Sequence, residues 1–327
     1  MPARTAPTNA RTHEPSVAVV IATRLRETRL AFALDALAEQ TLDHDRFEVI
    51  VVRPSDGSDG ALADVPPGLH VRYVTSPVVG AAAQRNLGWR ATEAPLVAFT
   101  DDDCRPAPDW LERLLAADGG SATMLQGRTE PDPDERHLLW GLARSWEITA
   151  ANGWYATCNM AYPRALLERV GGFDDRFPGA WGEDTDLGLR AHEAGARLSY
   201  VDDALVWHAV VPRPLPRALR EARRRGSTPA VVMRHPSHRA ELYCRIFAHE
   251  RHAKLLLAAA GLIALRRRPL LAAAATLPYL NAVYGRDRVT PRGLLRLVTH
   301  LPSRVSIDIT EIVITVRAAI RHRVLLI

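Results

Sequence analysis

The feature that most constrains the fold is an uncharged apolar segment that runs directly into three consecutive carboxylates. Residues 96–100 read Leu-Val-Ala-Phe-Thr, and Asp101, Asp102 and Asp103 follow at once. A continuous apolar strand is typical of a parallel sheet that is buried on both faces. Because ligands of open α/β sheets bind at the carboxyl ends of the strands, these carboxylates are expected at a binding edge. They suit Mg²⁺ or Mn²⁺ carried with the phosphates of a substrate, although an acidic loop before a helix explains the same residues.

The first hundred residues repeat a strand and helix pattern. Apolar strands are predicted over residues 16–23, 47–52 and 71–74, and helical spacing is found over 27–40 and 80–91. Strands that alternate with helices of this length indicate a doubly wound, mostly parallel sheet of the α/β class.

The charge distribution divides the 327 residues into unlike parts. Residues 212–327 carry 22 Lys and Arg against 6 Asp and Glu, whereas the remainder carries 20 against 31. Three prolines interrupt the chain where the sign of the charge changes, at Pro212, Pro214 and Pro216. We predict a disordered N-terminus over 1–15, an α/β domain over 16–211, and a helical basic region over 212–327 that meets an anionic partner.

Four segments, in order along residues 16–210, resemble the inverting family 2 glycosyltransferases of bacteria. The resemblance rests on an opening strand (residues 19–23), a small-residue helix with Arg-Asn (80–88) and an Asp-x-Asp motif (99–103). The fourth segment is a Gly-Gly-Phe-Asp loop (170–174) that leads to Glu-Asp (182–187). The resemblance implies a GT-A-like fold and transfer of a sugar from a nucleotide-diphosphate sugar.

The resemblance also implies a metal site. Asp101 and Asp103 bracket a Mg²⁺ or Mn²⁺ ion, which neutralises the diphosphate as it leaves. His208, at the end of a later apolar segment, is the third expected ligand, although a histidine at a strand end is often only a surface residue. The residues expected to bind the nucleotide are Thr23, Asp56, Arg85 and Asp102. Arg85 reaches the diphosphate in this interpretation, and an ion pair on the helix surface is the alternative.

Inversion needs a base that takes the proton from the acceptor hydroxyl. Asp184 matches the second acid of the family's Glu-Asp pair and is the expected base, while Glu183 contacts the acceptor or holds Asp184. Trp181 and Gly182, in the loop just before them, are expected to bind the acceptor. The alternative is structural, because acids in the first turn of a helix are favoured by the helix dipole.

One departure from the family concerns the nucleobase. The resemblance implies an acidic pair directly after the second strand, where this chain has Arg53 and Pro54. The nearest acid is Asp56. Either two extra residues shift the contact to Asp56, or base recognition differs and the donor is not the usual uridine nucleotide.

The basic region carries two apolar stretches, residues 255–265 and 269–283, separated by Arg266, Arg267 and Arg268. A helix of about 11 residues is about 16 Å long, too short for a hydrocarbon core of about 30 Å. A hairpin of two short helices at the membrane interface is therefore expected, with arginine clusters at 223–225, 266–268 and 321–323 on anionic headgroups. A soluble helical subdomain and a dimer interface are the alternatives.

These expectations combine into one function. The chain is predicted to transfer a sugar to a saccharide or lipid-linked acceptor in cell-envelope glycan synthesis. Three cysteines form no paired framework, which predicts a reducing compartment such as the cytoplasm. Together with the basic region, this predicts a place at the inner face of the cell membrane. The alternatives are a nucleotidyltransferase that acts on sugar phosphates, and a catalytically degenerate membrane scaffold. Nucleic acid is a poor partner, since few aromatic residues accompany the basic segments.

Overall fold

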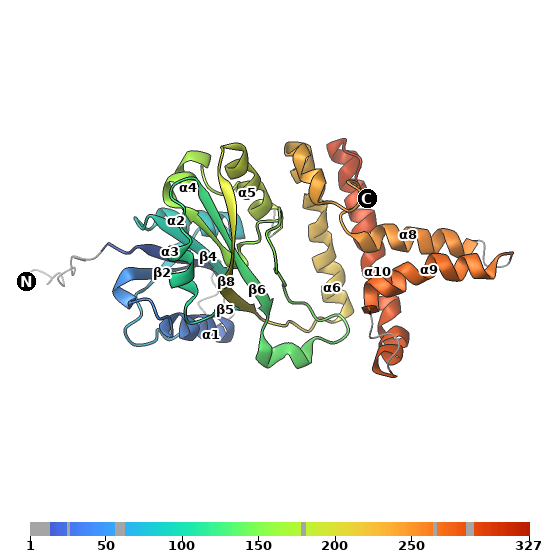
Figure 1. Cartoon of the computed structure of the whole chain (residues 1–327), viewed down its shortest axis with the longest axis horizontal. Helices are drawn as coiled ribbons and strands as arrows, with labels where there is room; N and C mark the ends of the chain where they lie inside the picture. Colours follow the sequence, from blue (N-terminus) through green and yellow to red (C-terminus); the bar gives the residue numbers. More distant parts are fainter. Residues whose placement is uncertain (1–13, 25–26, 56–62, 178–180, 264–266, 286–290) are drawn as a thin grey trace, which may run out of the picture.

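The computed structural model describes residues 14–24, 27–55, 63–177, 181–263, 267–285 and 291–327. It consists of an α/β domain followed by a helical tail that begins after the last strand (Figure 1). Asp56, one of the predicted nucleotide-binding residues, lies outside the described residues.

A single sheet of eight strands forms the centre of the α/β domain, in the order β3-β2-β1-β4-β7-β6-β8-β5. Four of the seven neighbouring pairs are parallel, and the three antiparallel pairs all involve β5 or β7. The strands are β1 (Val17–Ala22), β2 (Phe47–Pro54), β3 (Val71–Ser76), β4 (Leu96–Asp101), β5 (Cys104–Pro106), β6 (Thr123–Pro131), β7 (Met160–Pro163) and β8 (Arg197–His208). The predicted α/β class with a mostly parallel sheet is confirmed.

Helices cover both faces of this sheet, as a doubly wound fold requires. Leu30 and Leu34 of α1 are buried in one core cluster with Leu111 of α3, and Trp89 of α2 is buried in a second cluster with Leu187 of α5. The helices of this domain are α1 (Glu27–Ala38), α2 (Ala81–Arg90), α3 (Trp110–Ala116), α4 (Arg164–Val170) and α5 (Glu183–Glu193), with 3₁₀ turns η1 (His44–Arg46), η2 (Pro133–Leu138) and η3 (Thr157–Asn159). The alternation along β1 explains the two clusters, because neighbouring side chains of a strand point to opposite faces.

Strand pairing brings the predicted metal ligands together. β4 ends at Asp101, and the chain turns immediately into the short strand β5. β5 pairs antiparallel with β8, so that Cys104 lies opposite His208. The turn that carries Asp103 is therefore held beside the end of β8, more than one hundred residues later in the chain.

The tail packs through its last helix. α10 contacts α6, η4, α7 and α8. The elements are α6 (Leu215–Ala222), η4 (Arg223–Ser227), α7 (Thr228–Arg234), η5 (Pro236–Glu241), α8 (Glu250–Ile263), α9 (Pro269–Tyr284) and α10 (Pro291–His322). α8 and α9 form the expected helical hairpin, which projects away from the rest of the molecule (Figure 1). Among the described residues, no helix combines the length and the apolar character needed to cross a membrane.

Candidate active site

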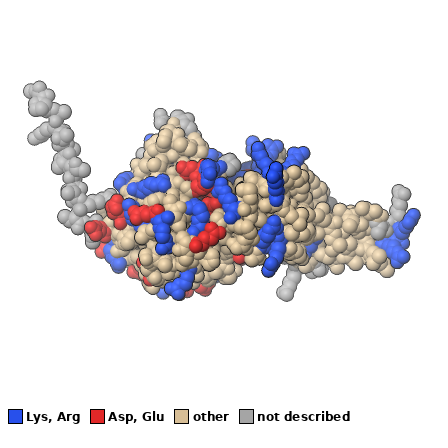
Figure 2. Space-filling model, turned by 90° about the horizontal axis from the view of Figure 1, so that it is seen from above, with Lys and Arg blue, Asp and Glu red and all other residues tan. Residues whose placement is uncertain are grey.

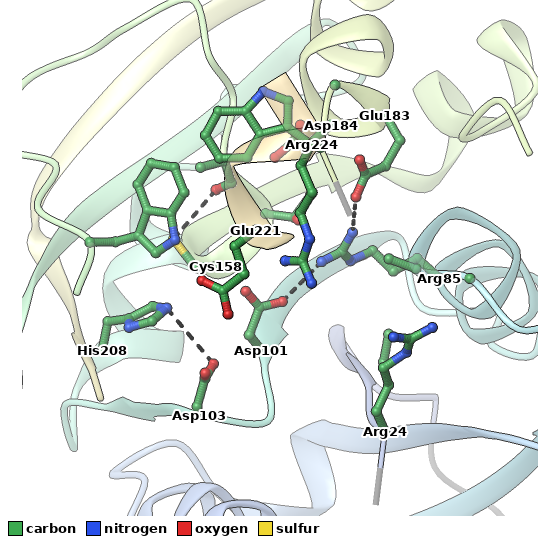
Figure 3. A pocket seen from close by; sticks show the side chains of 18 of the residues that line it. Arg24, Arg85, Asp101, Asp103, Cys158, Glu183, Asp184, His208, Glu221 and Arg224 are labelled. Carbon is green, nitrogen blue, oxygen red and sulfur yellow. Dashed lines mark hydrogen bonds and ion pairs between the residues drawn. The ribbon is translucent and has the colours of Figure 1, made fainter. Parts of the chain in front are cut away.

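A cavity of about 560 Å³ lies at the carboxyl ends of β1 and β4 and beside the first turn of α5 (Figure 3). The α/β domain supplies carboxylates to its lining, and the tail supplies the opposite side. Its lining includes Arg85, Asp101, Asp103, Arg144, Trp146, Trp181, Gly182, Glu183, Asp184, His208, Arg213, Arg217, Glu221 and Arg224.

Asp101, Asp103 and His208 converge on one point of this cavity. Together with Cys104, each offers a ligand atom within 4.8 Å of the others. The Nε2 atom of His208 lies 3.8 Å from an Asp103 carboxylate oxygen. Its Nδ1 atom lies 2.9 Å from the carbonyl oxygen of Ala209, which can only accept a hydrogen bond. Neutral His208 therefore carries its proton on Nδ1 and presents a free Nε2 lone pair to the carboxylates.

This donor set fits a hard divalent cation. Carboxylate oxygens with one imidazole suit Mn²⁺ or Mg²⁺ better than they suit a soft metal. Cys104 adds nothing to it, because burial raises the pKa of its thiol well above the ordinary value. A protonated thiol is a poor ligand. The three side chains that the sequence predicted as ligands thus lie together, with a buried thiol behind them.

Arg85 ties the metal-binding aspartates to the acidic pair of α5. Its guanidinium donates to Asp101 at 2.9 Å and to Glu183 at 3.0 Å. Burial would lower the pKa of Arg85, but Asp101 and Glu183 outweigh burial and raise it, so the side chain stays charged. The guanidinium faces two carboxylates and is buried, whereas we expected contact with a diphosphate or an ion pair on the helix surface.

Glu183 and Asp184 begin α5 and differ in their surroundings. Glu183 is 2% exposed, and its Oε2 atom has no hydrogen-bond partner. Burial and the charge of Asp184 raise the pKa of Glu183 to about 8. Asp184 is partly exposed, and its Oδ1 atom accepts from the Thr185 amide at 2.8 Å. Burial also raises the pKa of Asp184, which moves it toward the range where a carboxylate exchanges protons at neutral pH.

Thr23 and Asp102 lie behind the cavity. The Thr23 hydroxyl donates to Asp102 at 2.7 Å, both side chains are buried, and neither lines the cavity. Asp102 therefore supports the turn that presents Asp101 and Asp103, and it does not line the cavity, where we expected it to bind the nucleotide. The reason is geometric, since the flanking aspartates point into the cavity and Asp102 points away from them.

Trp181 and Gly182 stand at the entrance to α5. The Trp181 ring stacks on Trp146 with centroids 5.9 Å apart, and the Arg225 guanidinium lies 4.1 Å from the Trp181 centroid. Gly182 has φ of 94°, a left-handed conformation that favours glycine. Its backbone shapes the turn that aims Glu183 and Asp184 into the cavity, and Trp181 lines the wall beside them.

The tail, together with Arg144 of the α/β domain, supplies a basic wall that sequence reasoning missed. This basic wall consists of Arg144 from the loop after η2 and of Arg213, Arg217 and Arg224 from the start of the tail. We expected Arg223, Arg224 and Arg225 to face lipid headgroups, and that is wrong for two of them. Arg224 lines the cavity and Arg225 contacts Trp181. The positive surplus of the tail was the available signal, but it did not reveal that α6 and η4 fold back over the site.

Comparison with known proteins decides the family. A family model described as glycosyl transferase family 2 matches residues 18–173, and a second, described as glycosyl transferase family group 2, matches residues 96–284. The second match covers more than half of the chain and includes the start of the tail. The chain is a family 2 glycosyltransferase.

Relatives of this glycosyltransferase act on varied substrates, to judge from their names. Validoxylamine A glucosyltransferase of Streptomyces hygroscopicus subsp. limoneus is 30% identical over 275 residues, which cover 72% of this chain and 60% of that protein. Pre-mycofactocin glycosyltransferase of Mycobacterium tuberculosis (strain CDC 1551 / Oshkosh) is 33% identical over 204 residues, covering 58% of this chain and 41% of that protein. The chain thus spans about 60% of the first relative's length.

A solved structure supports the GT-A fold of this glycosyltransferase. The mannosyltransferase PcManGT from Pyrobaculum calidifontis, in complex with GDP-Man and Mn²⁺, matches with a TM-score of 0.59. The match covers 96% of this chain and 90% of that chain at 22% identity. It therefore extends through the helical tail as well as the α/β domain.

Proposed function

We propose that this glycosyltransferase transfers a sugar, with inversion and with a divalent metal ion, from a nucleotide-diphosphate sugar to a hydroxyl group of a saccharide or lipid-linked acceptor. One observation carries the proposal: the donor set of Asp101, Asp103 and His208 shares a single cavity with the acidic pair Glu183 and Asp184. A metal-bound diphosphate and an acceptor hydroxyl need these two groups on neighbouring walls.

Asp184 is the base in this proposal. The acceptor oxygen forms a bond to the anomeric carbon while the bond from that carbon to the diphosphate oxygen breaks, and the hydroxyl proton passes to an Asp184 carboxylate oxygen. Its partial exposure leaves it open to the cavity, whereas Glu183 is buried against Arg85. Glu183 and Arg85 then act as positioning residues that fix the start of α5 relative to Asp101.

Asp101, Asp103 and His208 are the side chains that would hold the metal ion. When bound, such an ion supplies Lewis-acid stabilisation of the negative charge on the departing diphosphate. Arg85 orients Asp101 through its 2.9 Å hydrogen bond. The solved relative with GDP-Man and Mn²⁺ supports this choice of donor class and metal.

The acceptor is proposed to bind against Trp181. A tryptophan ring offers an apolar face to the C–H groups of a sugar ring, and Trp181 lies two residues before Glu183 in the lining of the cavity. The relative named validoxylamine A glucosyltransferase supports glycosyl transfer as the reaction. The role in cell-envelope glycan synthesis belongs to the same proposal.

A donor hydrolysis screen tests the proposal. Purified protein with Mn²⁺ or Mg²⁺ is offered a panel of nucleotide sugars, and release of nucleoside diphosphate is measured beside Asp103→Ala. We expect metal-dependent release from one donor and none from the variant. Release of pyrophosphate in place of nucleoside diphosphate, in reactions with a sugar phosphate and a nucleoside triphosphate, would support the nucleotidyltransferase instead. Absence of nucleotide binding by calorimetry would support the scaffold.

We also propose that the hairpin of α8 and α9 rests on an anionic membrane surface at the inner face of the cell membrane. Its apolar side chains are open to solvent where the two helices meet their connection: Ile263 is 87% exposed and Leu270 is 84% exposed. Arg267 and Arg268 directly precede α9, and Figure 2 shows basic side chains at the far end of the projecting part. Exposed apolar groups beside arginines suit the boundary between anionic headgroups and acyl chains.

Co-sedimentation with vesicles tests this placement. Vesicles that contain phosphatidylglycerol are expected to bind the protein more strongly than phosphatidylcholine vesicles. The double variant Ile263→Glu/Leu270→Glu should lose most of this binding. Ile320→Glu is the matched control, because Ile320 is 73% exposed on α10, outside the hairpin. Equal binding by the double variant and the control would refute the hairpin as the contact.

A further inference from the structure

The basic wall of the cavity holds more positive charge than its own carboxylate can balance. Arg213 and Arg217 share a single partner, Glu221, at 2.9 and 3.0 Å. Arg144 and Arg224 form no ion pair with any carboxylate among the described residues. Four guanidinium groups therefore face the cavity with one carboxylate between them.

The environment of Arg144 shows the same excess of positive charge. Its guanidinium is stacked 4.8 Å from the centroid of Trp146, so it is partly withdrawn from water. Burial, and next the charge of Arg213, lower the pKa of Arg144 from its ordinary value. A bound anion on this wall would oppose the repulsion from Arg213 and raise the pKa of Arg144, as Glu221 and Asp103 already do in part.

The basic wall is attached next to the metal ligands. Arg144 pairs through its backbone with Val211, three residues after His208, in both directions at 2.8 and 3.0 Å. Figure 3 shows Arg224 and Glu221 reaching from the tail toward Asp101. An anion held near Asp101, Asp103 and His208 would thus have carboxylates and metal on one side and arginines on the other.

We propose that the basic wall binds the diphosphate of the nucleotide, with Arg224 and Arg144 as its principal contacts. This inference rests on the proposed function and adds a second source of positive charge to it. When the bond between the anomeric carbon and the diphosphate oxygen breaks, the electron pair goes to that oxygen. Guanidinium groups that donate charge-assisted hydrogen bonds to the diphosphate then stabilise the developing negative charge.

The wall gives part of the unequal charge of the sequence a role, since three of the 22 basic residues of the tail, Arg213, Arg217 and Arg224, line the cavity. The carboxylates of the α/β domain and the arginines of the tail are the two halves of one anion site, completed only when α6 and η4 lie over the strand ends. The tail accordingly belongs to donor binding as well as to any contact with a membrane.

Calorimetry on the full chain tests the inference with UDP, GDP and inorganic pyrophosphate as probes, each in Mg²⁺ and in EDTA. Arg224→Gln is compared with Arg220→Gln, a control that lies four residues earlier on α6, is exposed, forms no ion pair with a described residue and does not line the cavity. We expect Arg224→Gln to weaken binding of the nucleoside diphosphate and of pyrophosphate about tenfold, in Mg²⁺ and in EDTA. Arg220→Gln should match the wild type, as should the melting temperatures of both variants.

The two hypotheses fail differently in this experiment. A wild type that binds no nucleoside diphosphate at all refutes the proposed function, and the inference with it. A wild type that binds, with Arg224→Gln binding equally well, refutes only the basic wall as a diphosphate site. An Arg224→Gln variant that binds the nucleotide normally but raises the KM of a phosphorylated acceptor also refutes it, and assigns the wall to the acceptor.

Discussion

Two clusters of histidine and carboxylate side chains lie in the two halves of the molecule, and they differ in how their charges are neutralised. In the α/β domain, Asp101, Asp103 and His208 face an open cavity. In the tail, His252, Asp308 and Glu311 also come within metal-binding distance of one another. Residue types and spacing alone would rate the two clusters as equivalent metal sites.

The carboxylates of the tail cluster, Asp308 and Glu311, already have partners within the protein. Asp308 accepts from Tyr279 at 2.8 Å and from Arg304, and Glu311 lies 3.1 Å from His252 and 3.8 Å from Arg225. Burial alone would raise the pKa of Glu311, but the hydrogen bond to His252 and the charge of Arg225 outweigh burial and lower it to about 2. Opposite charges neutralise each other inside the tail, whereas in the cavity Arg85 pairs with Asp101 and Glu183 but Arg144 and Arg224 form no ion pair with a described carboxylate. Separation of charge across an open space marks a ligand site, and local neutralisation marks a structural one.

The largest expected effect separates the clusters by activity. Asp184→Asn removes the proposed proton acceptor while keeping nearly the same shape, so kcat should fall by about 10²–10⁴. Binding of the donor should be unchanged. His252→Ala, in the tail cluster, should leave the KM for the donor unchanged, as measured in a transfer assay with a defined acceptor. A kcat for Asp184→Asn within a factor of about three of wild type would move the role of base to another residue.

The second expected effect distinguishes the cavity cluster from the tail cluster by their contributions to the free energy of unfolding. Asp308→Ala removes a fully buried carboxylate, leaves the half-buried Arg304 and Arg251 without it, and should cost about 3–5 kcal/mol in the free energy of unfolding. Asp101→Asn should cost less than about 1 kcal/mol, because Arg85 retains Glu183. Urea unfolding followed by circular dichroism measures both. Equal losses would mean that both clusters are structural.

The third expected effect distinguishes the two clusters by metal binding. Mn²⁺ at a concentration about one hundred times its dissociation constant should stabilise the fold by about 2.7 kcal/mol. Asp103→Ala should abolish this stabilisation, and His252→Ala should keep it, in thermal unfolding with and without EDTA. Loss of the stabilisation in His252→Ala alone would place the ion in the tail.

The smallest effect, taken per pH unit, concerns the pH dependence of Glu183. Because burial and Asp184 raise its pKa to about 8 in the folded state, the folded protein binds a proton that the unfolded chain releases near its ordinary value of 4.5. Its contribution to stability is therefore present below about pH 4.5 and is lost as the pH rises toward 8. Relative to wild type, Glu183→Gln should gain stability across this interval, by up to about 1.4 kcal/mol per pH unit. A difference between the two proteins that does not vary with pH would show that Glu183 is ionised throughout.

Much of the α/β domain could be predicted because its signals are local. Apolar runs such as residues 96–100 define a strand by themselves, and helical spacing in α1 defines its buried face. The convergence of Asp103 with His208 was available only through the family resemblance, since β5 and β8 meet across one hundred residues. The orientation of Asp102 could not be predicted in this way, because Asp102 lies in the turn between β4 and β5, where the alternation of a strand no longer applies.

The basic wall could not be predicted for a different reason. The surplus of arginine in the tail gives the amount of charge but not the position of the arginine side chains. Residues of α6 and η4 line the cavity because α10 packs against both elements. The packing of Ala218 and Ala222 of α6 against Ile307 of α10 is a long-range contact that no local pattern encodes. Nothing in the triplet Arg223–Arg225 tells which of its members turns inward.

The contact between Arg225 and Trp181 has a consequence for anyone who wishes to exchange parts between related enzymes. Arg225 lies 4.1 Å from the Trp181 centroid and 3.8 Å from Glu311 of α10. Through Arg225, Glu311 near the C-terminal end of the sequence is therefore connected to Trp181, which comes just before α5. A chimaera joined at residue 211 would inherit its sugar-transfer chemistry from one parent and part of its substrate pocket from the other. Swapping tails is therefore a route to altered selectivity, and trimming them is not a route to a minimal catalyst.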